Sequence, residues 1–141
     1  NGGQTKSSVE YETKKMKNHH GGMAAVSGYL YGFDEGTLVC LELKSGKVKW
    51  EDRSVGKGSL TIADGMLYLR SEEGPVGLAE VTPDGYNETG RFNPERSDKP
   101  AWSHPAVAGG KLFLRDMDLL LVYDVIFLAV AVMVFEAIVS E

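Results

Sequence analysis

Short apolar segments alternate with tight-turn residues along most of this chain. Three of these segments begin with glycine followed by a short pattern ending in an aromatic residue: Gly28-Tyr29-Leu30-Tyr31, Gly65-Met66-Leu67-Tyr68 and Gly110-Lys111-Leu112-Phe113. Each is preceded by an apolar run, at residues 23–26, 60–63 and 106–108. The first two glycines are 37 positions apart and the next two are 45 positions apart. Such self-similarity predicts a repeated structural unit, and four-stranded blades of a β-propeller repeat at about 40 to 50 residues.

Each unit continues with a second apolar segment, at residues 38–43, 76–81 and 119–125. Turn residues follow the first two of these segments, Ser45-Gly46 and Pro83-Asp84-Gly85, and return strands are expected at residues 48–50 and 86–92. The sequence therefore predicts an all-β fold, a partial β-propeller of four-stranded antiparallel blades. The second and third strands of a unit are almost continuously apolar, as in sheets buried on both faces. Trp50 and Phe92 are expected to fill the gaps between neighbouring blades.

The repeat divides the chain into an incomplete propeller over residues 1–125 and an apolar tail of uncertain structure over residues 126–141. Within the propeller we expect the last strand of a preceding blade at 8–18, blades at 19–56 and 57–100, and a partial blade at 101–125. The apolar run from Val125 to Phe135 is too short to span a membrane. The tail could cover an open sheet edge, bind a partner, or be a non-native end.

Composition and charge exclude several classes of function and site but point to none. A net charge of -5 and a single small basic cluster, Lys14, Lys15 and Lys17, argue against nucleic-acid binding. The one cysteine, Cys40, excludes an intramolecular disulfide and a cysteine-rich zinc site. The chain begins at Asn1 without a signal peptide or an initiator Met, so we expect it to be a piece of a longer protein.

The turn region of the first unit carries a motif that also occurs in a known protein family. This region places Cys40, Glu42, Ser45, Gly46 and Trp50 at the spacing Ala-x-Asp-x-x-Thr-Gly-x-x-x-Trp, with conservative changes at the first three positions. The chain therefore resembles the pyrroloquinoline quinone (PQQ)-like β-propeller repeat proteins over most of residues 8–125. These five residues identify the blade and are expected to be structural, with no catalytic residue among them.

The resemblance implies two classes of function. One is a non-catalytic binding or scaffold module. Such a module would be bacterial and either periplasmic or secreted, and no cofactor is expected in this fragment. The alternative is part of a quinoprotein dehydrogenase that oxidises alcohols or sugars with PQQ and calcium. The adjacent cysteine pair of those enzymes is absent here, which favours the scaffold and leaves enzymatic activity uncertain. A purely structural repeat without a ligand is a third possibility.

Superposing the repeats suggests where a ligand would bind. His20, Lys57 and Trp102 each lie eight positions before the repeat glycine, and His19 and His104 lie beside them. All precede the innermost strand, so in a complete ring these side chains would face the mouth of the central channel. They could hold a protein or a small polar ligand, or they could be loop residues that cap blade ends. The remaining blades of the parent propeller are the other expected partners, and no metal site is expected.

Overall fold

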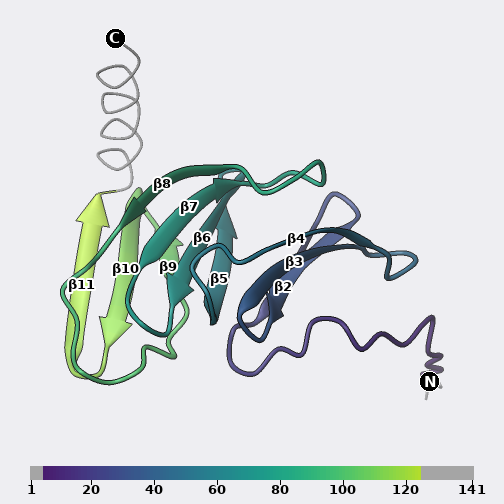
Figure 1. Ribbon diagram of the computed structural model, residues 1–141, viewed down its shortest axis with the longest axis horizontal. Coiled ribbons are helices and arrows are strands. Elements are labelled where there is room, and N and C mark those ends of the chain that lie inside the picture. Colours follow the sequence, from purple (N-terminus) through teal and green to yellow (C-terminus); the bar gives the residue numbers. More distant parts are fainter. Residues whose placement is uncertain (1–4, 125–141) are drawn as a thin grey trace, which may run out of the picture.

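The computed structural model describes residues 5–124, which form three antiparallel sheets arranged side by side (Figure 1). The first sheet contains β1 (Met23–Val26), β2 (Tyr29–Asp34), β3 (Thr37–Glu42) and β4 (Val48–Asp52). The second contains β5 (Gly58–Ala63), β6 (Met66–Ser71), β7 (Val76–Glu80) and β8 (Glu88–Phe92). The third contains β9 (Ala106–Ala108), β10 (Lys111–Asp116) and β11 (Leu119–Asp124).

Each sheet is a meander in which consecutive strands pair, as the repeat pattern predicts. The first two sheets share a register shift at the same place, between Cys40 and Leu41 in β3 and between Leu78 and Ala79 in β7. Gly46 adopts a φ of 69° in the turn that follows β3, a conformation that glycine takes without steric cost. The all-β, blade-like architecture is therefore confirmed.

The three sheets span residues 23–52, 58–92 and 106–124, and each falls inside one of the expected blade ranges. Asp116-Met117-Asp118 forms the hairpin turn between β10 and β11, with Met117 at a φ of 53°. The expected apolar tail at residues 126–141 lies outside the described residues. Residues 5–124 contain no helix that is long and apolar enough to cross a membrane.

The first and second sheets pack face to face through a buried apolar cluster. Tyr31, Phe33, Leu38 and Cys40 contribute from the first sheet, and Val55 is buried at the connection. The second sheet contributes a matching row, Leu60, Leu67, Leu69 and Ala79. Side chains alternate between the two faces of a strand, so this cluster uses one face of β2 and β3 only.

The opposite face of the second sheet packs against the third in the same manner. Tyr68 and Val76 meet Leu112 and Leu114, and all four side chains are buried. The second sheet is therefore covered on both faces, which explains the nearly continuous apolar sequence of β6 and β7.

Trp50 and Phe92, both on the outer strands of their sheets, pack in the gaps between blades, as predicted. The Trp50 ring lies between Tyr31 and Tyr86, with ring centroids 6.0 and 6.2 Å away. Its Nε1 donates a hydrogen bond of 2.9 Å to the Thr82 carbonyl oxygen, across from one sheet to the next. Phe92 packs edge-on against Tyr123 with centroids 5.0 Å apart.

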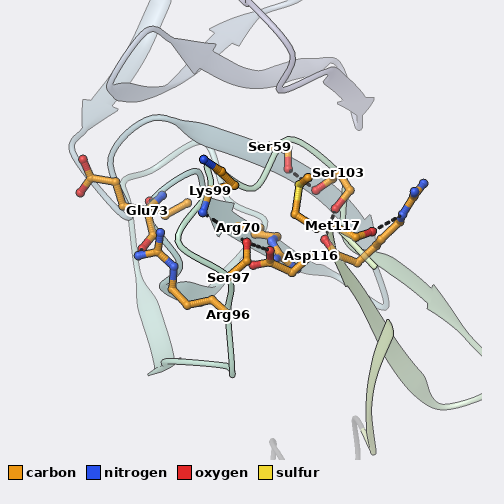
Figure 2. A network of polar contacts seen from close by, with 11 residues as sticks. Ser59, Arg70, Glu73, Arg96, Ser97, Lys99, Ser103, Asp116 and Met117 are labelled. Carbon is orange, nitrogen blue, oxygen red and sulfur yellow. Dashed lines mark hydrogen bonds and ion pairs between the residues drawn. The ribbon is translucent and has the colours of Figure 1, made fainter. Parts of the chain in front are cut away.

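A buried ion pair joins the second and third sheets near the ends of β6 and β10 (Figure 2). Arg70 Nη2 lies 3.2 Å from Asp116 Oδ2, and both side chains are fully buried. The Ser97 hydroxyl, from the connection between the sheets, donates to the other carboxylate oxygen at 2.5 Å. Burial lowers the pKa of the Arg70 guanidinium and the charge of Asp116 opposes this. Arg70 Nε and Nη1 have no hydrogen-bond acceptor among the described residues.

The structure differs from the prediction at residues 8–18, where a strand was expected but residues 5–22 contain none. This segment pairs with none of the described sheet edges, and a strand requires such pairing. Its contacts are made mainly by side chains. Met16 is buried against Leu30, Val39 and Leu41, on the face of the first sheet that points away from the second.

The position of Trp50 predicts a graded loss of stability. Replacing Trp50 with Phe keeps most of the apolar contact and removes the Nε1 hydrogen bond, which should lower the free energy of unfolding by about 1 kcal/mol. Trp50→Ala should cost about 3 kcal/mol because the gap between sheets is left unfilled. Urea unfolding measures both. The matched control is Trp102→Phe, at an exposed indole, which should change stability by less than about 0.5 kcal/mol. Equal losses for the two Trp→Phe variants would contradict this account.

The Arg70–Asp116 pair predicts a strongly non-additive pair of substitutions. Asp116→Leu leaves a buried, uncompensated guanidinium and should cost about 3 to 5 kcal/mol. Adding Arg70→Met removes that charge, so the double variant should recover most of the loss. A double-mutant cycle followed by urea unfolding gives the coupling free energy. Additive losses from the two substitutions would show that the pair does not interact as described.

Candidate functional site

The loops that lead into the innermost strands lie at one end of the blades. In an up-and-down sheet, the start of the first strand and the turn between the second and third strands lie at the same end. Residues 18–22, 53–57 and 93–105 precede β1, β5 and β9, and the β10–β11 turn at Met117 lies at this end too. We refer to these segments as the loop end. The turn at Ser45-Gly46 lies at the opposite end.

Three of the five predicted site residues meet at the loop end. The rings of His20 and Trp102 are 5.3 Å apart between centroids, with their planes inclined by 32°. His104 Nε2 donates a hydrogen bond of 2.7 Å to the carbonyl oxygen of His20. The His104 ring also lies against Gly22, where a Cβ would come within 2.3 Å of it. The hydrogen bond between His104 and His20 joins the third unit to the first, across 84 positions of sequence.

Hydrogen bonds to β5 hold these two loops beside each other. On one side, the Leu60 amide donates to the Gly21 carbonyl oxygen at 3.1 Å. On the other side, the Ser59 hydroxyl donates to the Ser103 carbonyl oxygen at 3.2 Å. Gly21 is required here, because a Cβ at this position would lie 2.2 Å from the Gly58 carbonyl oxygen. The innermost strand of the second sheet therefore positions the loops on both of its flanks.

The other two predicted residues have different surroundings. Lys57 pairs with Glu72, with Nζ 3.2 Å from Oε1, and the Glu72 amide donates to the Lys57 carbonyl oxygen at 2.8 Å. Glu72 in turn accepts a 2.9 Å bond from the Ala101 amide through its own carbonyl oxygen, which ties Lys57 indirectly to the loop of Trp102. His19 is exposed, with its ring centroid 6.4 Å from that of His20.

An open pocket of about 700 Å³ adjoins the stacked rings on the side of the third sheet. Trp102 and Met117 contribute the large apolar surface, and their side chains are 58% and 55% exposed. Arg115 and Asp118 supply charge at the rim. Arg115 Nε donates to the Met117 carbonyl oxygen at 3.1 Å, and the Ser103 hydroxyl donates to the Arg115 carbonyl oxygen at 2.5 Å. These bonds fix the turn and the loop relative to each other (Figure 2).

The blade-motif residues are placed where they hold the sheet together. Cys40 is fully buried between the first two sheets, and burial raises the pKa of its thiol. The Ser45 hydroxyl donates to the Glu42 carboxylate across the turn, and Gly46 closes that turn. These contacts hold the turn and the sheet together.

Calcium in proteins is held by several oxygen ligands that lie close together. Within residues 5–124, no three His, Cys, Asp or Glu side chains lie close enough together to hold a metal ion. The described residues therefore do not fit the calcium that the dehydrogenase alternative would require, and no step of a mechanism is assigned to it.

Sequence reasoning missed four residues of the loop end: Glu72, Arg115, Met117 and Asp118. Each lies in or beside a turn between the second and third strands of a unit, whereas the predicted site residues all precede the first strand. The up-and-down order of strands places both kinds of loop at one end, so this signal was available in the predicted strand order.

Comparison with known proteins agrees with the architecture. Residues 1–129 match the family described as outer membrane protein assembly factor BamB. Among solved structures, BamB from Moraxella catarrhalis superposes with a TM-score of 0.55 at 14% identity, over 71% of this chain and 29% of that one. A glutaminyl cyclase from Myxococcus xanthus gives a TM-score of 0.48 at 21% identity, over 73% of this chain and 47% of that one.

The search of curated proteins found no match. The chain spans less than a third of the length of the BamB structure that it resembles, so the similarity concerns a group of blades. The family match covers nearly all of the sequence, and the three sheets reproduce the blade pattern of the BamB structure. This chain belongs to the PQQ-like, BamB-type β-propeller repeat family.

Proposed function

We propose that this chain is part of a non-catalytic scaffold that binds a partner protein at the loop end, through Trp102 and the residues around it. The observation that carries the proposal is the exposed indole of Trp102, which is held against the ring of His20 at the rim of an open pocket. Trp is among the residue types most enriched at the positions that dominate binding in protein interfaces.

The composition of the pocket favours a protein partner over a small polar ligand. Aromatic residues, Met and Arg are enriched in protein interfaces, and Trp and Arg dominate the binding free energy there. Trp102, Met117 and Arg115 supply these three types within one pocket. A small polar ligand would need converging polar groups in an enclosed site, and the apolar side chains here are half exposed.

The loop end is also held in place before a partner arrives. The His104 bond to His20 and the Ser103 bonds fix the loops on either side of Trp102. Binding then orders few additional side chains, which reduces its entropic cost. The predicted loop-capping role of His104 and a binding role of Trp102 are thus compatible, because the first supports the second.

The family description suggests where such a scaffold would act. BamB is named as a factor of outer membrane protein assembly. From this similarity we infer that the present chain acts in the bacterial envelope, periplasmic or secreted, with a subunit or client of that assembly machinery as the partner. His19 and Lys57 would then lie at the periphery of the binding surface.

Substitution at the loop end tests the proposal. Trp102→Ala, made in the protein that contains this chain, should weaken binding to purified assembly-machinery subunits at least about tenfold, as for a central interface residue. His20→Ala should weaken binding less, because it removes only the support of the indole. Binding is measured by surface plasmon resonance, and far-UV circular dichroism checks the fold. The matched control is Leu43→Ala, at an exposed apolar side chain of the opposite end.

Two outcomes would contradict the scaffold function. Equal weakening by Trp102→Ala and Leu43→Ala would show that the loop end is not the binding surface. Turnover of alcohols or sugars, in a dye-linked assay of the same protein supplied with PQQ and calcium, would establish the dehydrogenase instead.

A further inference from the structure

The buried ion pair between the second and third sheets joins two fixed positions of the repeat (Figure 2). Arg70 lies five positions after the repeat glycine of its unit, and Asp116 lies six positions after the repeat glycine of the next unit. Side chains alternate between the faces of a strand, so Arg70 shares a face of β6 with Tyr68, and Asp116 shares a face of β10 with Leu114. Tyr68 and Leu114 belong to the apolar cluster between these two sheets. Position five of one blade therefore meets position six of the next.

The boundary between the first and second sheets carries no charge at the same two positions. Position five of the first unit is Phe33, a buried member of the apolar cluster between these sheets, and position six of the second unit is Ser71. Ser71 is also buried, and its hydroxyl oxygen accepts a hydrogen bond of 3.1 Å from the Glu73 amide within its own turn. The residues at positions five and six thus match in character at both boundaries, charged with charged and uncharged with uncharged.

Arg115 occupies position five of the third unit and is the counterpart of Arg70. It pairs with Leu120 across β10 and β11, as Arg70 pairs with Val76 across β6 and β7, so the two arginines lie on the same face of their sheets. The Arg115 side chain is exposed, and its Nε donates to the Met117 carbonyl oxygen at 3.1 Å. Its Nη1 and Nη2 make no hydrogen bond or ion pair with the described residues.

A blade packed on this face would bury the Arg115 guanidinium, as the third sheet buries that of Arg70. A buried guanidinium without an anionic partner is strongly destabilising. The contact already made between the second and third sheets places such a partner at position six of the following blade. This chain matches 29% of the BamB structure, so a ring of that size contains blades beyond the three described.

We propose that Arg115 binds a carboxylate of the blade that follows the third sheet in the complete ring, at the position that Asp116 occupies in its own unit. Matching of positions five and six then helps each blade to select its neighbour, because a mismatched blade would leave a charge buried and unpaired. The contact between Trp102 and His20 takes no part in this pairing, which is therefore separate from the partner binding proposed above.

Substitution of Arg115 in the protein that contains this chain tests the pairing. Arg115→Met removes the charge, keeps a long side chain and leaves the carboxylate of the following blade without its partner. The urea midpoint of unfolding should fall by about 1 M. Arg115→Lys keeps the charge and should retain at least half of the lost stability. The matched control is Arg53→Met, at an exposed arginine between the first two sheets, which should move the midpoint by less than about 0.2 M.

The present chain serves as a second control, because Arg115 is exposed in it. Here Arg115→Met should leave the urea midpoint unchanged, and a fall equal to that in the longer protein would show that Arg115 acts within its own turn. An unchanged midpoint in the longer protein would overturn the proposal. So would a residue other than Asp or Glu at position six of the following blade.

Should Arg115→Met fail to fold in the longer protein, a double variant decides the question. Replacing the acidic residue at position six of the following blade with Leu, together with Arg115→Met, removes both charges and should restore folding. A double variant that is no more stable than Arg115→Met alone would show that the two residues do not pair. Weaker partner binding without any loss of stability would assign the carboxylate to a separate protein and would also overturn the proposal.

Discussion

Face-to-face packing of sheets is the constraint on which the rest of this structure depends. A single blade here is a meander of short strands with apolar side chains on both faces, and it cannot bury either face alone. The second sheet meets the constraint on both sides, through Leu69 toward the first sheet and Tyr68 toward the third. The Arg70–Asp116 pair and Trp50 add directional contacts across the same two boundaries, which fix how each blade is oriented on the next.

The candidate site follows from this packing. His20 and Trp102 belong to units one and three, and they meet because β5 of the intervening sheet bonds to the loops on both of its sides. The site therefore forms only when all three sheets pack together. The binding surface proposed above combines a supported indole, a methionine and an arginine.

The sequence predicted the sheets because their cause is local and repeated. The glycine steps at Gly28, Gly65 and Gly110 mark the turns, and the continuous apolar strands reveal sheets covered on both faces. It wrongly predicted a strand at residues 8–18, because the alternation around Val9 and Tyr11 also occurs in a segment that pairs with no strand. The Met16 side chain packs where a Cβ at Gly32 would lie. This fit depends on the three-dimensional structure, and the spacing of residues in the sequence does not predict it. Met117 differs, because the predicted strand order already places its turn at the same end as Trp102.

The central claim is that packing of the blades brings the loops of the first and third units together to form one site. Nuclear Overhauser contacts between ring protons of His20 and Trp102 test it most directly, in the folded protein and without any ligand. The account predicts clear cross-peaks between the two rings, since their centroids lie 5.3 Å apart. Absence of these cross-peaks, while contacts between Trp50 and Tyr86 are observed, would show that the sheets pack but do not assemble the site.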